Sequence, residues 1–203
     1  MEKNVYLFVC EKLADWEAGL ATALLSDTYT IIPKLHSYPV VTFGLSRDPV
    51  RSFGGLSITP DTDLSGVNPG NAAMVILPGS PLYEEHDPIE LVPVLQECVR
   101  RQVPIAAVCG GTLFLARHGF LDSVRHTSCG PGWLKQHAPG YTGGDFYDPM
   151  PCVSDKGIIT ANPLGFVEFA RAVHEKLDVF PPGFSEQLYE VIRMGYMDLG
   201  RYG

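Results

Sequence analysis

The ten residues 103–112, V-P-I-A-A-V-C-G-G-T, constrain the fold more than any other segment of the chain. Residues 103–108 form an apolar run of the length of a buried strand, which ends at a cysteine and two glycines. A helix is expected to follow from Thr112 to about His118. A strand that turns sharply into a helix presents the turn residue at the carboxyl edge of a sheet, which is the geometry of a nucleophile elbow.

The turn residue is Cys109, and two interpretations of it stay open. The amino end of the following helix favours a thiolate, and the two glycines let the backbone bend and a substrate approach closely. The alternative is a small buried cysteine at a strand end, because free cysteine is among the most buried residue types.

Composition narrows the class of protein. The 203 residues carry a net charge of −8 and are 45% hydrophobic, as in a globular domain, and no basic cluster points to nucleic-acid binding. The apolar run at residues 5–10 is too short for a membrane span or a signal peptide, so a cytoplasmic protein is expected. The five cysteines lack zinc-finger spacing and are expected to be thiols, and we predict neither a metal nor a cofactor.

The hydrophobic pattern predicts strands that alternate with helices. The expected strands are residues 5–10, 29–32, 40–43, 74–77, 103–108, 126–129 and 158–161, with a hairpin at 50–59. The expected helices are residues 16–25, 89–101, 112–118, 165–177 and 185–194, and residues 130–151 form a long surface excursion. This alternation predicts an α/β fold with a parallel sheet covered by helices on both faces. No domain boundary is evident, so residues 1–203 are predicted to form one domain, with a helical extension at about 181–203.

Three loops, of which the Cys109 turn is one, should converge at the carboxyl ends of the strands, where ligands bind in such sheets. One carries Asp15 and Glu17, and another carries Gly79. A carboxyl group beside a thiolate is driven toward its protonated form, so Glu17 could donate a hydrogen bond to the sulfur. The N–H groups of Gly79 and Gly110 could hold an oxyanion. The alternatives are acidic residues that stabilise a helix start, which spacing alone favours, and glycines that only make turns.

Four segments of the chain resemble motifs of the ThiJ/PfpI superfamily. They are V-C-G-G-T-L-F-L-A-R-H-G-F-L-D-S-V-R-H-T from residue 108, L-P-G at 77–79, A-D-W-E at 14–17 and I-I-T-A-N-P at 158–163. The motifs are most similar to those of the bacterial YdeA-type branch, and the resemblance spans nearly the whole chain. It implies a flavodoxin-like three-layer sandwich with the class I glutamine amidotransferase-like fold, which is usually a homodimer. It also implies a nucleophile at Cys109 and a contacting acid at Glu17. Activities in this superfamily include peptide or amide hydrolysis, glyoxalase or deglycase chemistry, and oxidative-stress sensing.

The chain departs from the superfamily at the histidines. Peptidase-type relatives carry histidine directly after the nucleophile, where this chain has Gly110, and others carry it twenty residues later, where this chain has Cys129. His126 would point away from Cys129 if residues 126–129 form a strand. Ala107 and the lack of a late His-x-Glu pattern argue against glutamine hydrolysis by this chain.

The remaining histidines and Cys129 each carry two interpretations. His86, after the Pro78-Gly79 loop, and His137, in the excursion, could reach the site, but surface or structural roles are favoured for both. Cys129 either fills the space of the missing histidine passively, which we favour, or acts as a resolving thiol once Cys109 is oxidised.

Three functions are compatible with these residues. The first is a cytoplasmic enzyme that acts through a Cys109 thiolate on a small carbonyl or amide substrate, with Glu17 orienting and protonating it. The second is a non-catalytic redox or stress sensor in which Cys109 is oxidised. The third is a ligand-binding domain whose pocket is lined by Trp16 and Trp133. No nucleic acid or membrane partner is expected.

Overall fold

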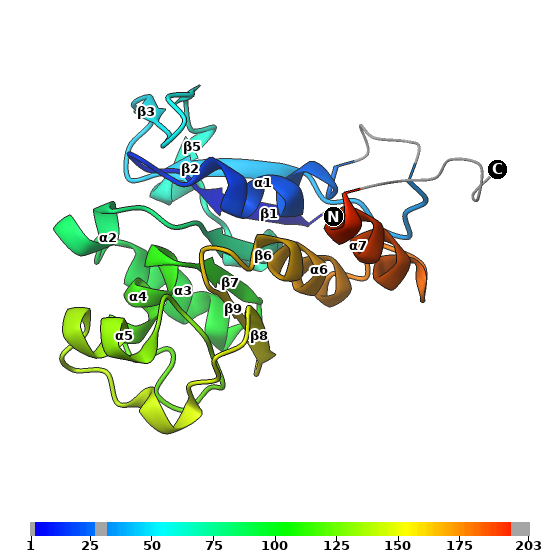
Figure 1. The fold of residues 1–203 in the computed structure, drawn as a ribbon. Coiled ribbons are helices and arrows are strands. Elements are labelled where there is room, and N and C mark those ends of the chain that lie inside the picture. The colour runs from blue at the N-terminus through cyan, green and yellow to red at the C-terminus, as the bar shows by residue number, and fades with distance from the viewer. Residues whose placement is uncertain (1–2, 27–31, 196–203) are drawn as a thin grey trace.

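The computed structural model describes residues 3–26 and 32–195 and contains a seven-stranded sheet in the order β5-β2-β1-β6-β7-β9-β8 (Figure 1). Every neighbouring pair is parallel except β8 and β9, which are antiparallel. The strands are β1 (Asn4–Phe8), β2 (Val40–Gly44), β5 (Thr62–Asp63), β6 (Ala72–Leu77), β7 (Ile105–Val108), β8 (Cys152–Asp155) and β9 (Ile158–Ala161). The predicted parallel sheet is confirmed, and an antiparallel strand closes one of its edges.

Helices cover both faces of the sheet, which gives the predicted flavodoxin-like three-layer arrangement (Figure 1). One face carries α1 (Asp15–Ala23), α6 (Phe166–Lys176) and α7 (Phe184–Met194). The other carries α2 (Leu82–Glu85), α3 (Leu91–Arg100), α4 (Gly110–Arg117) and α5 (Pro131–His137).

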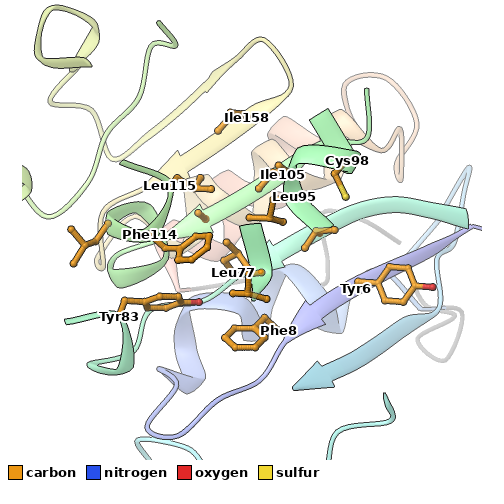
Figure 2. Close-up of a cluster of buried hydrophobic side chains, with 14 of the residues drawn as sticks. Tyr6, Phe8, Leu77, Tyr83, Leu95, Cys98, Ile105, Phe114, Leu115 and Ile158 are labelled. Atoms are coloured by element: carbon orange, nitrogen blue, oxygen red, sulfur yellow. The ribbon is translucent and has the colours of Figure 1, made fainter. Parts of the chain in front are cut away.

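The central strands are buried on both sides, which explains why their sequences lack polar alternation. Within β6 and β7, Leu77 and Ile105 pack into the core under α3 and α4, together with Tyr83 and Phe114 (Figure 2). The alternate residues of the same strands pack into the core under α1 and α6. Strands β6 and β7, which lead into the Gly79 loop and the Cys109 turn, are therefore packed on both faces.

The structure corrects part of the predicted element list. The hairpin at 50–59 is confirmed as β3 (Val50–Arg51) and β4 (Ser57–Ile58). Residues 126–129 do not form a strand, because only a single bridge joins His126 to Tyr147. The excursion contains α5 and the 3-10 helix Gly143–Phe146, and β8 follows it where no strand was predicted. Of the strand predicted at 29–32, residues 29–31 lie outside the described residues, and Ile32 lies in a bend.

A buried histidine ties the helices of one face together. The Nε2 atom of His174 on α6 lies 2.7 Å from the carbonyl oxygen of Ala21 on α1, and its Nδ1 atom hydrogen-bonds the Tyr189 hydroxyl on α7. Both ring nitrogens are thus used in a side chain that is only 1% exposed. Burial lowers the pKa of His174 to about 4, so the ring is neutral near neutral pH.

Gly111 in α4, beside the elbow, and Gly19 in α1 differ in the space around them, so alanine substitutions at the two positions test the packing at Gly111. A Cβ on Gly111 would overlap the Leu77 carbonyl oxygen, whereas a Cβ on Gly19 would meet no atom within 4 Å. We expect Gly111→Ala to destabilise the protein by about 1–3 kcal/mol through backbone displacement. Gly19→Ala should stabilise it by about 0.5–1 kcal/mol, because alanine loses less backbone entropy in a helix. Urea unfolding of both variants measures the difference, and equal free energies of unfolding would contradict the predicted contact.

Candidate active site

Cys109 sits at a backbone turn that side chains rarely adopt. It joins β7 to α4 with φ 50° and ψ −118°, in the region that favours glycine. Its N–H donates to the Ala161 carbonyl at 3.0 Å, and its carbonyl accepts from the Thr112 N–H at 3.0 Å. Such a conformation costs about 1–3 kcal/mol and persists only where its surroundings fix it. The nucleophile elbow expected from the sequence is therefore present in the backbone.

Close packing explains the glycine that follows the cysteine. A Cβ on Gly110 would lie 2.6 Å from the Ser80 carbonyl oxygen and 3.0 Å from a ring carbon of Tyr83. A side chain as large as histidine could not occupy this position without moving the β6–α2 loop. The histidine that peptidase-type relatives carry here is thus excluded by the local packing as well as by the sequence.

Glu17 is buried beside the cysteine. Its side chain lies on the first turn of α1, the residue is 1% exposed, and its Oε2 atom accepts a hydrogen bond from the Gly79 N–H at 2.6 Å. The Cys109 side chain acts on this carboxyl group as well and lowers its pKa. Burial raises the pKa of Glu17 to about 7, against the opposing effects of the Gly79 N–H and Cys109. Near neutral pH the carboxyl group can therefore both accept and return a proton.

Gly79 holds Glu17 and Cys109 together. A Cβ at this position would lie 2.5 Å from Oε2 of Glu17 and 2.7 Å from Cβ of Cys109. The Gly79 carbonyl also accepts from the Ala14 N–H at 2.9 Å, which joins this loop to the start of α1. The three loops predicted to meet at the elbow do meet there.

The predicted oxyanion role of Gly79 is not supported, because its N–H is already bound by Glu17. The Gly110 N–H, at the start of α4, lies against the Cys109 sulfur and lowers the pKa of that thiol, although less than other groups raise it. The Gly110 N–H is thus placed beside the Cys109 sulfur, and its role as an oxyanion donor stays a prediction.

Cys129 lies directly against Cys109. The two sulfur atoms are 3.4 Å apart and hydrogen-bonded, and Cys129 is exposed whereas Cys109 is half-buried. This contact places the side chain that the sequence analysis left undecided within reach of Cys109.

The two thiols have pKa values shifted in opposite directions. The pKa of Cys109 is raised by its hydrogen bond with Cys129, by burial and by the charge of Glu17. The pKa of Cys129 is lowered because the Cys109 S–H can donate to its thiolate. Both shifts arise from the contact between the two sulfurs, so the ionisation of Cys109 depends on Cys129 as well as on the helix amino end expected from the sequence.

Hydroxyl groups fix the segment that carries Cys129. Thr127 N–H donates to the Thr160 hydroxyl at 2.8 Å, and the hydroxyl groups of Ser128 and Thr112 lie 2.6 Å apart. All four of these residues are buried. Thr160 could have indicated this support in the sequence, because a buried hydroxyl in the apolar strand I-I-T-A must find a hydrogen-bond partner. Sequence reasoning did not identify this support.

The histidines near the elbow in sequence form hydrogen bonds with groups other than the Cys109 sulfur. The ring of His126 bonds the Val124 carbonyl and the Tyr141 hydroxyl, His118 pairs with Asp87, and His137 bonds the Trp133 carbonyl. His86 follows α2 and is exposed. Across residues 3–26 and 32–195, no histidine is hydrogen-bonded to Cys109, so His86 and His137 are not joined to the site.

Trp16 lies at the outside of the site. Its indole N–H donates to the Pro163 carbonyl at 3.1 Å, and its ring packs edge-on against Phe53. Together with Asp15 and Leu56, these rings line a shallow hollow that does not include Cys109. Trp133 instead packs against His137 on α5. The two tryptophans therefore do not line one common pocket.

Neither a metal site nor a membrane span is found in the described part of the chain. Among these residues, no three histidine, cysteine, aspartate or glutamate side chains gather as metal ligands. None of the helices described is long and apolar enough to cross a bilayer.

The DJ-1/PfpI family model matches residues 3–176. The chain belongs to the DJ-1/PfpI family. Its relatives include two proteins of Bacillus subtilis (strain 168): "Uncharacterized protease YoaZ", 36% identical over 93% of this chain and 90% of that protein, and "Uncharacterized protease YdeA", 27% identical over 97% and 93%. The similarity to YdeA agrees with the branch indicated by the motifs.

Two further comparisons bear on chemistry and fold. The "Glutathione-independent glyoxalase DJR-1.2" of Caenorhabditis elegans is 28% identical over 68% of this chain and 73% of that protein. The crystal structure of a thiJ/pfpI family protein from Bacillus anthracis superposes with a TM-score of 0.84 at 30% identity, over 97% of this chain and 92% of that one. DJ-1/PfpI relatives thus carry both protease and glyoxalase names, and the geometry of the site must distinguish between these activities.

Proposed function

We propose that this DJ-1/PfpI protein is a cysteine-dependent enzyme that converts small reactive carbonyl compounds, with 2-oxoaldehydes as the best-matched class. The observation that carries the proposal is the buried Glu17 carboxyl beside the elbow, which is 1% exposed, accepts from the Gly79 N–H at 2.6 Å and shares the close packing of Gly79 with Cys109. Burial raises its pKa to about 7. The glyoxalase name of the DJR-1.2 relative supports the same substrate class.

The first step is the addition of the thiol to the aldehyde. Ionised Glu17 takes the proton from Cys109, the sulfur bonds to the aldehyde carbon, and the carbonyl π electrons move to the oxygen. Glu17 then returns the proton to that oxygen, which gives a neutral thiohemiacetal. A carboxyl group with a pKa near the working pH is suited to both transfers.

The same carboxyl group can complete the conversion of a 2-oxoaldehyde. Ionised Glu17 removes the C–H proton of the former aldehyde carbon, and the electrons of that bond form an enediolate with the neighbouring carbonyl. Glu17 returns the proton to the neighbouring carbon, while the hydroxyl proton of the first carbon passes to the neighbouring oxygen, which yields a thioester. Water then releases a 2-hydroxy acid and restores the thiol. No external oxidant or reductant is needed, because one carbon is oxidised as its neighbour is reduced.

Peptide hydrolysis is the second candidate, favoured by the protease names of YoaZ and YdeA. It requires a group that protonates an amine leaving group, which in cysteine hydrolases is usually an imidazole. No histidine is bonded to Cys109 in the described residues, and packing excludes one at Gly110. Carbonyl addition has no amine leaving group, so it fits the site better.

Glu17→Gln tests this assignment. We expect kcat/KM for methylglyoxal to fall by roughly 10²–10⁴-fold, the usual contribution of general acid–base catalysis. In the parent protein, kcat/KM should rise with a midpoint near pH 7 as Glu17 ionises, and this rise should disappear in Glu17→Gln.

Asp15→Asn is the matched control. Asp15 lies on the same turn of α1, but its Oδ2 atom accepts from the Gly54 N–H at 2.7 Å, away from the sulfur. This variant should keep both activity and pH profile. Parallel assays with a peptide and a primary amide separate the candidates, since turnover of peptide but not methylglyoxal would overturn the carbonyl assignment.

A further inference from the structure

The exposed cysteine beside the elbow has no role in the proposed carbonyl chemistry. Cys129 lies 3.4 Å, sulfur to sulfur, from Cys109. A disulfide bond is about 2.05 Å long, so a shift of little more than 1 Å brings the two sulfurs to bonding distance. The structure thus holds two free thiols almost at the separation of a cross-link.

The backbone before Cys129 is fixed by hydrogen bonds, whereas the residue after it has open space around it. The preceding residues are anchored by the buried hydroxyl groups of Ser128 and Thr112 and by the Tyr147 hydroxyl, which donates to the Ser128 carbonyl at 3.2 Å. The next residue is Gly130, with φ 145°, where an added Cβ would meet no atom within 4 Å. The Cys129 sulfur can therefore approach Cys109 by a small local rotation, without disturbing the buried anchors.

The two thiols differ in access and in ionisation. Cys129 is exposed to a dissolved oxidant, whereas Cys109 is half-buried beside Glu17. Cys129 is also the thiol of lowered pKa, because Cys109 can donate to its thiolate. An exposed thiolate beside a second thiol is the arrangement in which a sulfenic acid forms and is then resolved as a disulfide.

We propose that the Cys109–Cys129 pair reduces small hydroperoxides, with Cys129 as the sulfur that meets the oxidant and Cys109 as the resolving thiol. The Cys129 thiolate attacks the peroxide, so that an S–O bond forms and the O–O bond breaks. The departing alkoxide takes up the proton that Cys129 released, which gives an alcohol and a Cys129 sulfenic acid.

The second step closes the disulfide. The Cys109 sulfur attacks Cys129, its proton passes to Glu17, the S–O bond breaks, and the departing hydroxide receives that proton as water. The two sulfurs together lose the two electrons that the peroxide gains. A small dithiol, such as dithiothreitol, returns both thiols by exchange.

Stoichiometric oxidation of the reduced protein tests the proposal. One equivalent of hydrogen peroxide should remove two alkylatable thiols, lower the intact mass by two hydrogens and give a Cys109–Cys129 cross-linked peptide, all reversed by dithiothreitol. Cys129→Ala should lose the cross-link. Cys109→Ala should instead trap a sulfenic acid on Cys129 that reacts with dimedone. Cys152→Ala, which removes a half-buried cysteine on β8, should behave as the parent protein.

The outcomes separate this proposal from the carbonyl assignment. Oxidation that stops at a sulfinic acid on Cys109, with Cys129 still alkylatable, would overturn the peroxide proposal and leave methylglyoxal turnover untouched. Sulfenic acid on Cys109 in the parent protein, with no dimedone adduct on Cys129 in Cys109→Ala, would overturn the assigned order. If the protein forms a reversible cross-link but does not convert methylglyoxal, the peroxide proposal is supported and the carbonyl assignment is refuted.

Discussion

Cys109→Ser is expected to lower kcat/KM for methylglyoxal by roughly 10³-fold or more, because a serine hydroxyl is a far weaker nucleophile than a thiol assisted by a carboxylate. The substitution changes one atom at a position whose backbone is fixed by Ala161 and Thr112. The fold should therefore survive, and the loss should appear in turnover and not in the free energy of unfolding.

Cys152→Ser is the matched control for Cys109→Ser. Burial raises the pKa of Cys152 to about 12, and the side chain lies on the antiparallel edge strand β8. Its replacement should leave kcat/KM unchanged. Substrate loss is followed in the absence of glutathione, with circular dichroism as the check on folding. Parent-level turnover by Cys109→Ser would show that the carbonyl chemistry does not pass through the elbow sulfur.

The main features of the site could be predicted from the sequence because they depend on local backbone logic. An apolar strand that ends in Cys-Gly-Gly can hardly place its cysteine anywhere but at the carboxyl edge of the sheet. The same edge gathers the loops that follow β1 and β6, so the approach of Glu17 and Gly79 to Cys109 follows from topology. These predictions required no knowledge of side-chain packing.

What could not be predicted depends on contacts between distant segments. The Gly79 N–H was expected to face substrate, but the buried Glu17 carboxyl binds it first. The pKa of Cys109 was expected to fall at a helix amino end, but burial and the neighbouring Cys129 and Glu17 raise it. A helix terminus contributes only about 0.3–1 kcal/mol at a surface, which desolvation easily exceeds.

The region after the elbow shows the same limit for secondary structure. Residues 126–129, H-T-S-C, were predicted as a strand, yet their bridging is limited to the isolated bridge between His126 and Tyr147. Hydrogen bonds to distant side chains fix this segment in place of a ladder: the His126 ring bonds the Tyr141 hydroxyl, the Thr127 N–H donates to the Thr160 hydroxyl, and the Ser128 hydroxyl bonds that of Thr112. Such bonds compete with regular structure, and their partners lie too far away in sequence to be recognised.

Glu17 should also make stability depend on pH. Below pH 4.5 the carboxyl is protonated in both states, and between pH 4.5 and about 7 the unfolded chain releases the proton that the native state keeps. The native state then binds more protons, so the free energy of unfolding falls as pH rises through this window. Relative to the parent protein, Glu17→Gln should gain on the order of 3 kcal/mol between the two ends of the window.

His174 acts in the opposite direction over a similar range. Its pKa is about 4 in the native state against 6.5 as the ordinary value, so the unfolded chain binds the extra proton as pH falls. Stability is therefore lost on acidification from about pH 6.5 to 4, and His174→Gln should remove that loss, also on the order of 3 kcal/mol. In the parent protein the two contributions largely offset each other.

Urea unfolding from pH 4 to pH 8 separates these two groups, because each variant exposes the contribution of the other. Glu17→Gln should leave a free energy of unfolding that rises with pH, and His174→Gln should leave one that falls. The opposite slopes make the variants controls for each other. If the profile of Glu17→Gln ran parallel to that of the parent protein, the carboxyl would titrate alike in both states. The rise of kcat/KM near pH 7 would then need a different group, and Glu17 could not be the residue that carries the proton from Cys109 to the substrate.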